Sequence, residues 1–331
     1  MAAPVLEVKD LHVTFASPDG AVQAVRGLDL MDSEGESLGI VGESGSGKSV
    51  SMLAVMGLLP RNATVTGSVR FRGEELLGRP DPELRRLRGG KLAMIFQDPM
   101  TSLNPVLSVG FQIAEAIEAH HPGTDRKAAM ARAAELLDLV GIPNAAARAR
   151  QYPHEFSGGM RQRAMIAMAI ANDPDVLVAD EPTTALDVTI QAQILGVLER
   201  AQEATGAAIL LITHDLGVVA GVADRIVVMY AGRAVETGGI YNVFGHPRHP
   251  YTLGLLASLP RLDDRGRERL VPIPGSPPSM VHPPPACAFH PRCPFAREMC
   301  REETPLLRPI EGTAQCSACH FAEELDGLEP S

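Results

Sequence analysis

The chain has 331 residues, of which 45% are hydrophobic, so it can bury a substantial core in more than one domain. Its formal net charge of −10 argues against a nucleic-acid-binding protein, because neutralising phosphates normally requires a basic face. No apolar run approaches the roughly 20 residues that span a bilayer. The N-terminus lacks the basic segment and apolar stretch of a secretory signal, so we expect a cytoplasmic location.

The first part of the chain contains short apolar segments bounded by Gly and Asp, a pattern typical of β-strands. Strands are expected over residues 6–15, 22–30 and 37–41. The glycine-rich segment that follows opens a stretch with apolar residues at helical spacing, and Pro60 ends it. The apolar positions of this stretch are Val50, Leu53, Ala54 and Leu58. The predicted order is therefore strand, loop, helix.

The middle of the chain alternates between strand and helix patterns. A strand is expected at 94–96, followed by helices at 109–117, 128–140 and 160–171 in alanine-rich sequence. Further on, strands are expected at 176–179, 208–213 and 226–229, with a helix at 190–204. This alternation predicts an α/β fold with a parallel sheet flanked by helices, interrupted by a helical insert.

The sequence changes character beyond about residue 232. Seven of the sixteen residues from 271 to 286 are proline, which cannot belong to the interior of a helix or sheet. All five cysteines of the chain lie between 287 and 319. In a cytoplasmic protein such clustering indicates a metal or cluster site rather than a disulfide framework. The sequence therefore predicts a linker that leads into an irregular, cysteine-bearing tail.

The segment GESGSGKS at 42–49 fits the P-loop pattern, in which backbone N–H groups surround phosphates at a helix N-terminus. Lys48 is predicted to reach the β and γ phosphates, and the Ser49 hydroxyl to bind Mg²⁺. The other residues expected to contact the nucleotide are Gly42, Ser44, Gly45, Ser46 and Gly47. The alternative, a chance glycine loop before a helix, is disfavoured by the strand and the helix expected on either side, so the pattern indicates a nucleotide-binding site.

Two acidic residues, Asp180 and Glu181, follow the apolar strand expected at 176–179. The carboxyl ends of parallel strands are where ligands bind in such folds. Asp180 is therefore predicted to hold Mg²⁺ and Glu181 to activate a water molecule. A strand followed by two acids is more often a solvated strand end, but the upstream P-loop favours the catalytic interpretation.

The segment FSGGMRQR at 156–163 resembles the signature motif of ABC transporter ATPases, with Met160 where most families carry Gln. Gln97, residues 185–187 and His214 resemble, in the same order as in that family, the Q-loop, the D-loop with Asp187, and the switch histidine. Taken singly, Gln97, Asp187 and His214 could instead be a strand cap, a helix N-cap and a polar loop residue. Phe15 resembles the aromatic residue on which adenine stacks, with a core position as the alternative.

The resemblance implies a P-loop NTPase (RecA-like) core with an N-terminal antiparallel β subdomain, a helical insert and an irregular, cysteine-rich C-terminal extension. The expected boundaries are 1–96 and 172–232 for the core, 97–171 for the helical subdomain, and 233–331 for the extension. The family hydrolyses ATP in a dimer that sandwiches two nucleotides. The signature residues expected to serve the opposing subunit's site are Ser157, Gly158, Gly159 and Met160.

Within the site, the resemblance gives Glu181 the role of polarising water, while Gln97 and His214 sense the γ-phosphate. Gln97 is also expected beside Mg²⁺. A different class, an ABC ATPase that acts on DNA or ribosomes, usually carries two cassettes or a long coiled-coil insert, and the sequence has neither. A non-hydrolysing module is disfavoured because no catalytic position is degenerate.

Two further segments resemble importers of oligopeptides, dipeptides and nickel. Residues 98–110 resemble the segment that contacts the membrane subunits, and HPYT at 249–252 together with the cysteines resembles the C-terminal extension. The signature form is closer to the "D" than to the "F" ATPase of such importers. This implies a peripheral protein on the cytoplasmic face of the membrane that energises peptide uptake, with nickel or glutathione as alternative cargo.

The same resemblance implies the partners. They are a second ATPase, more readily in a heterodimer than in a homodimer, two transmembrane permease subunits and, indirectly, an extracytoplasmic substrate-binding protein. From ligand chemistry alone the cysteines could hold zinc or an iron–sulfur cluster, or remain unligated. The resemblance favours a 4Fe–4S cluster on Cys287, Cys293, Cys300 and Cys319, with Cys316 as an alternative fourth ligand.

Overall fold

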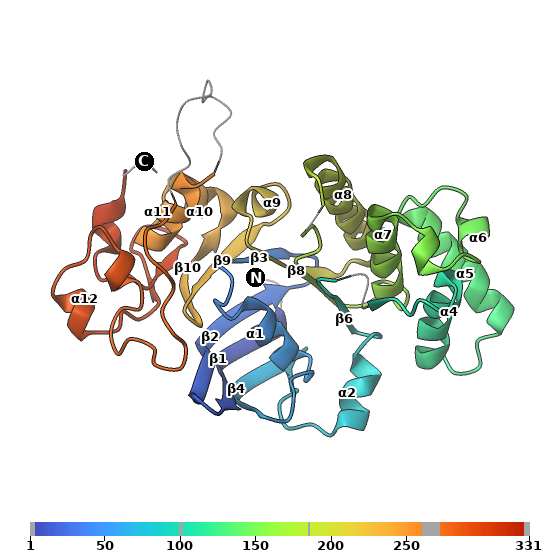
Figure 1. Cartoon of the computed structure of the whole chain (residues 1–331), viewed down its shortest axis with the longest axis horizontal. Coiled ribbons are helices and arrows are strands. Elements are labelled where there is room, and N and C mark those ends of the chain that lie inside the picture. Colours follow the sequence, from blue (N-terminus) through green and yellow to red (C-terminus); the bar gives the residue numbers. More distant parts are fainter. Residues whose placement is uncertain (1–3, 99–101, 185, 260–271, 328–331) are drawn as a thin grey trace. The chain divides into compact units, whose positions relative to one another are not determined.

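The computed structural model describes residues 4–98, 102–184, 186–259 and 272–327 (Figure 1). The chain forms two compact units, each built from separate stretches of sequence. The helical unit comprises Met1–Leu6, Asp32–Ser37 and Phe71–Ile212. The P-loop unit comprises Glu7–Met31, Leu38–Arg70 and Thr213–Ser331. Across the described ranges, no helix has both the length and the apolar character needed to cross a membrane.

The sheet of the helical unit contains three parallel strands, in the order β6 (Leu92–Ile95), β7 (Val176–Asp180) and β8 (Ala208–Thr213). Every residue of β7 and β8 is buried. Strands that are covered on both faces are apolar throughout, which is why their sequences show continuous runs rather than alternation. The short strand β5 (Glu74–Glu75) also belongs to this unit.

The helices of this unit pack mainly on one another (Figure 1). Helix α7 (Gly158–Ala169) contacts α4 (Val109–His120), α5 (Arg126–Leu139) and α8 (Val188–Thr205). Small buried residues such as Ala129 and Ala133 allow these helices to approach closely. Shorter helices are α2 (Asp81–Leu87), α6 (Ala145–Arg148) and the 3₁₀ turn η1 (Pro153–Glu155).

The P-loop unit contains an N-terminal sheet in the order β2 (Gly20–Ser33), β1 (Pro4–Ser17), β4 (Ala63–Phe71). Only two residues join β1 to β2, so these neighbouring strands run antiparallel. Helix α1 (Lys48–Val55) follows the glycine-rich loop.

A second sheet of this unit has the order β3 (Ser37–Val41), β9 (Arg225–Tyr230), β10 (Arg233–Gly239), β12 (Cys316–Ser317), β11 (Arg308–Pro309). Strands β3 and β9 are parallel, whereas the pairs from β9 to β11 are antiparallel. The cysteine-bearing tail therefore adds strands to the sheet of the P-loop.

The region beyond residue 232 is more regular than the sequence analysis predicts. After β10 come α10 (Ile240–Gly245) and α11 (Pro250–Ala257), and the proline-rich residues 272–286 then form no helix or strand. The tail contains η2 (His290–Arg292), α12 (Met299–Glu302) and η3 (Ala322–Leu325), and α9 (Leu216–Ala220) lies earlier in the unit. Local periodicity missed these elements because they are short and interrupted by Gly and Pro.

Candidate functional site: a nucleotide-binding P-loop

The glycine-rich loop lies between the end of β3 at Val41 and the start of α1 at Lys48. Gly42, Gly45 and Gly47 have φ values of 152°, 79° and 101°, which residues with side chains rarely adopt. A Cβ on Gly42 would lie 2.2 Å from the Met229 carbonyl oxygen, and one on Gly47 would lie 2.4 Å from that of Ala24. Glycine is therefore required at these two positions by conformation and by space.

Lys48 lies inside the curve of this loop and is only 5% exposed. Its Nζ donates to the carbonyl oxygens of Gly42 at 2.7 Å and Glu43 at 3.0 Å. The ammonium group therefore sits beside the first turn of α1, where the helix dipole adds partial positive charge. Ser46 is buried in the loop, and Ser49 is half-buried in the first turn of the helix. This arrangement of cation and backbone N–H groups suits a chain of phosphates.

The C-terminal extension contacts the P-loop through an ion pair between Arg292 and Glu43, which the sequence analysis did not predict. Arg292 donates from Nη1 to Glu43 Oε2 at 2.7 Å and from Nη2 to Glu43 Oε1 at 2.9 Å. The Arg292 side chain is 4% exposed, and its pKa is raised mainly by the bonds to Glu43. Tyr251 accepts a hydrogen bond from the Glu43 backbone N at 2.8 Å. Arg292 and Tyr251 thus fix the second residue of the P-loop from both its side chain and its backbone.

Replacing Arg292 with Ala should lower the free energy of unfolding by about 2–3 kcal/mol, because Glu43 would keep a partly buried carboxylate with no cation. ATP should also bind more weakly, since the loop loses its side-chain anchor. The surface variant Arg85→Ala removes an ion pair whose arginine is 76% exposed, and should cost at most about 1 kcal/mol. Urea unfolding and ATP titration of both variants check this. Equal losses in the two variants would contradict a structural role for Arg292.

The helical unit brings together two predicted catalytic residues, Gln97 and Glu181. The carboxylate oxygen Oε2 of Glu181 accepts from Gln97 Nε2 at 2.9 Å and from the Thr184 hydroxyl at 2.8 Å. Asp180, the last residue of β7, is 6% exposed. Glu181 has a φ of 46°, a conformation that costs a non-glycine residue about 1 kcal/mol or more and that clusters at functional sites.

The signature segment forms the N-terminus of α7. Ser157 caps this helix by accepting a hydrogen bond from Met160 N at 3.3 Å. Ser157 and Gly158 are exposed, and a Cβ on Gly158 would meet no atom within 4 Å. Gly159 lies close to α8: a Cβ added at this position would be 3.2 Å from Ile190 Cγ2. The helix therefore presents an uncrowded N-terminus that favours negative charge.

The remaining predicted residues are more scattered. Asp187 caps α8 by accepting from Ile190 N at 3.0 Å, and this is the alternative that the sequence left open for it. His214 is exposed immediately after β8, and Phe15 is half-buried on β1 rather than part of the core. Residue 185 of the D-loop segment and residues 99–101 of the insert lie outside the described residues.

The predicted nucleotide-site residues divide between the units. The residues of the P-loop unit are Phe15, Gly42, Ser44, Gly45, Ser46, Gly47, Lys48, Ser49 and His214. Those of the helical unit are Gln97, Ser157, Gly158, Gly159, Met160, Asp180, Glu181 and Asp187. Within each unit the geometry suits one part of ATP chemistry: phosphate binding in the first, and a carboxylate held by two donors in the second.

Four cysteines of the extension line one small cavity together with His249 and Phe289. The four are Cys287, Cys293, Cys300 and Cys319. Burial, and then the neighbouring cysteines, raise the pKa of Cys293 to about 12 and that of Cys319 to about 11. Cys316 lies outside this cavity on β12. In the part of the chain that the structure describes, no group of three or more Cys, His, Asp or Glu residues is arranged to hold a metal ion.

Comparisons with known proteins agree with this geometry. Residues 25–184 match the family model "ABC transporter", and residues 235–300 match "Oligopeptide/dipeptide transporter, C-terminal region". Among solved structures, the dimeric ATP-binding cassette MJ0796, bound to ADP and Pi in a post-hydrolysis state, has a TM-score of 0.64. It is 28% identical and covers 71% of this chain, which covers 98% of that one. The predicted P-loop ATPase core with an antiparallel N-terminal sheet is thereby confirmed.

Curated relatives extend over nearly the whole chain. OppD of Mycobacterium tuberculosis is 55% identical over 98% of this chain, which spans about half (53%) of that longer relative. OppD of Haemophilus influenzae is 53% identical over 90% of this chain and 92% of its own length. DppD of Bacillus subtilis is 52% identical over 94% of each chain. The chain therefore belongs to the ABC transporter family, within the group of oligopeptide and dipeptide transport ATP-binding proteins.

Proposed function

We propose that this chain binds and hydrolyses MgATP as the motor subunit of an ABC importer for dipeptides and oligopeptides. The observation that carries the proposal is Lys48, buried in a loop of obligate glycines at a helix N-terminus. That loop is anchored by the extension, the region that matches the oligopeptide/dipeptide transporter model. The oligopeptide and dipeptide relatives support the choice of cargo.

Each predicted residue then has a proposed role. Lys48 neutralises the β and γ phosphates, while Ser49, Asp180 and Gln97 serve Mg²⁺. Glu181 activates the attacking water as a general base, and its bonds to Gln97 and Thr184 orient the carboxylate for that task. His214 senses the γ-phosphate, Phe15 stacks on adenine, and Asp187 acts in the D-loop.

We further propose that the nucleotide site is completed in trans by a second ATPase, with a heterodimer ahead of a homodimer. The support is the uncrowded N-terminus of α7, whose partial positive charge suits a γ-phosphate held by another subunit.

Ser157→Arg places a bulky cation at that N-terminus and should abolish hydrolysis at the partner's site. When this variant is paired with a partner whose own P-loop lysine is removed, both changes fall in the partner's site, so the site formed by Lys48 and the partner's signature helix should keep its ATP turnover. Ala131→Arg, which adds the same cation at an exposed position of α5 in the same unit, is the matched control. Turnover at background in the first pair, the result expected if each subunit used its own signature helix, would contradict completion in trans.

The proposed setting is the cytoplasmic face of the membrane, where the chain would bind two permease subunits that receive cargo from an extracytoplasmic binding protein. The test is to express the chain with its neighbouring permease genes and to measure ATP hydrolysis by the purified complex. Addition of peptide-loaded binding protein should stimulate turnover. Stimulation by nickel-loaded or glutathione-loaded protein alone would reassign the cargo, and copurification with nucleic acid instead of permeases would reject transport.

We also propose that Cys287, Cys293, Cys300 and Cys319 hold a 4Fe–4S cluster, because four thiols facing one cavity are the donor set that such a cluster requires. Zinc stays the alternative. The proposed role is structural, since the free energy of metal ligation would stabilise the fold of a tail with few regular elements. The three-part domain division given above remains a prediction.

Anaerobically purified protein should be brown and contain about four irons per chain. Cys319→Ser should lower the iron content, whereas Cys316→Ser, the matched control outside the cavity, should leave it unchanged. Stoichiometric zinc without iron would contradict the assignment of a 4Fe–4S cluster. Loss of iron in Cys316→Ser alone would identify Cys316, instead of Cys319, as the fourth ligand.

A further inference from the structure

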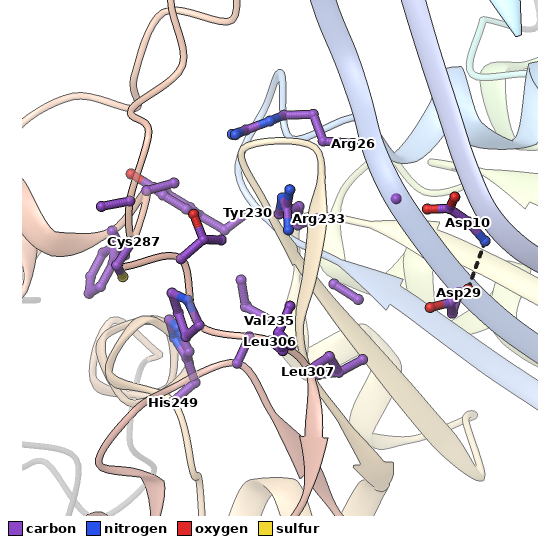
Figure 2. A pocket seen from close by; sticks show the side chains of 18 of the residues that line it. Asp10, Arg26, Asp29, Tyr230, Arg233, Val235, His249, Cys287, Leu306 and Leu307 are labelled. Atoms are coloured by element: carbon purple, nitrogen blue, oxygen red, sulfur yellow. Dashed lines mark hydrogen bonds between the residues drawn. The ribbon is translucent and has the colours of Figure 1, made fainter. Parts of the chain in front are cut away.

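A second cavity of about 350 Å³ lies within the P-loop unit (Figure 2). Its walls come from the N-terminal sheet, the β9–β10 hairpin and the cysteine-bearing tail. No residue of 42–49 lines it. Its volume falls within the range of small-molecule sites, which are usually apolar with a few polar groups that fix orientation.

Two arginines, Arg26 of β2 and Arg233 of β10, face this cavity near the hairpin turn (Figure 2). Arg26 Nη1 and Arg233 Nε are buried, and neither has a hydrogen-bond partner among the described residues. Neither side chain forms an ion pair with any described residue. Burial and, next, the charge of Arg233 lower the pKa of Arg26. Two partly buried guanidinium groups therefore lie close together without a compensating anion among the described residues, an arrangement that costs stability.

The other residues that line the cavity restrict which anionic ligand could bind beside the two arginines. Val235, Leu306 and Leu307 give the cavity an apolar wall (Figure 2). His249 also lines it but stays neutral at physiological pH, because burial lowers its pKa to about 3. Another histidine of the lining, His12, has its Nε2 2.9 Å from Asp10 Oδ1. Arg26 and Arg233 are therefore the permanent positive charges of the lining, and they favour a ligand with one anionic group attached to an apolar body.

Two acids, Asp10 and Asp29, also line the cavity and lie to the right of the arginines in Figure 2. Asp10 N donates to Asp29 Oδ1 at 2.7 Å, so the two residues are held together, and both are exposed. Their carboxylates disfavour ligands that carry several negative charges, such as nucleotides. The same carboxylates favour a ligand that also carries an amine, because a protonated amine is attracted to their negative charge.

We propose that this cavity binds a small molecule through a single carboxylate, held between Arg26 and Arg233, with its apolar part against Val235 and Leu306. Guanidinium groups bind carboxylates with two parallel, charge-assisted hydrogen bonds. A short peptide with a free C-terminus belongs to this class of ligand. The site rests on the cavity alone and does not depend on the transported cargo, so its failure would leave the proposed ATPase function intact.

The test is calorimetric titration of the full chain with the dipeptide alanyl-leucine, its C-terminal amide and inorganic phosphate. The dipeptide should bind at least about tenfold more tightly than the amide, the scale of one lost charge-assisted hydrogen bond. Arg26→Gln and Arg233→Gln should each weaken dipeptide binding by at least about tenfold. ATP binding should be unchanged in both variants, which also establishes that they are folded.

Arg61→Gln, which removes the same charge from an exposed position of the same unit outside the cavity, should bind the dipeptide like the wild type. Equal affinity for the dipeptide and its amide would overturn the proposal, as would undiminished binding in the two arginine variants. No dipeptide binding to the wild type at ~10 mM would also overturn it. Tighter binding of inorganic phosphate than of the dipeptide would overturn the preference for carboxylate.

Discussion

Glu181→Gln should bind ATP and hydrolyse it roughly 10²–10⁴-fold more slowly than the wild type, the usual scale for losing a general base. Gln removes the charge that accepts the proton of the attacking water, yet it keeps an oxygen that can accept from Gln97 or Thr184. The fold of the β7 edge should therefore survive. Measuring phosphate release and ATP binding in parallel separates the loss of chemistry from the loss of binding.

The matched control is Glu203→Gln, which neutralises an exposed carboxylate on α8 of the same unit. Its turnover should equal that of the wild type. If Glu181→Gln retained turnover within about threefold of wild type, a different residue would have to activate the water.

Lys48→Ala should lose at least about two orders of magnitude in ATP affinity, because the buried ammonium is the fixed cation of the loop. The loop also loses its internal bonds from Nζ to the carbonyls of Gly42 and Glu43. Lys127→Ala, which removes an exposed lysine of α5, is the control for loss of one positive charge. Fluorescence titration with a labelled ATP analogue measures both. Wild-type affinity in Lys48→Ala would reject the P-loop assignment.

The buried parallel strands were predictable because their apolar runs are short and continuous. The expected strands at 37–41 and 208–213 coincide with β3 and β8. The expected strand at 94–96 starts two positions too late and ends one position too late, since β6 spans Leu92–Ile95 and Phe96 is 41% exposed. Hydrophobicity identifies a strand, but the hydrogen-bonded neighbour β7 determines where the ladder ends.

Helix α1 illustrates a different kind of error. The expected apolar face used Val50, Leu53, Ala54 and Leu58, whereas the helix ends at Val55 and buries Ser51, Met52, Ala54 and Val55. The stretch is apolar on several faces, so its periodicity is ambiguous. The P-loop fixes the rotation of the helix by placing Lys48 inside the loop, and this constraint is tertiary.

The sequence predicts those parts of the candidate site whose residues are close together in the chain. It does not predict contacts between residues that are far apart in the chain. The P-loop pattern identified the glycines whose φ values and close contacts require glycine. The order of motifs assigned Gln97 and Glu181 to one site, but it did not predict the hydrogen bond between their side chains. The Arg292–Glu43 pair joins residues 249 positions apart, and no local pattern in one sequence reports such a contact.

Peptide uptake tests the central claim most directly. Proteoliposomes that contain the complete importer, with ATP on the side of this chain, should accumulate labelled oligopeptide delivered by the binding protein on the other side. Accumulation should require ATP and should fall to background when Glu181→Gln or Lys48→Ala replaces the wild-type chain. Equal uptake by wild-type and Glu181→Gln vesicles, or uptake without ATP, would contradict an ATP-hydrolysing peptide import motor.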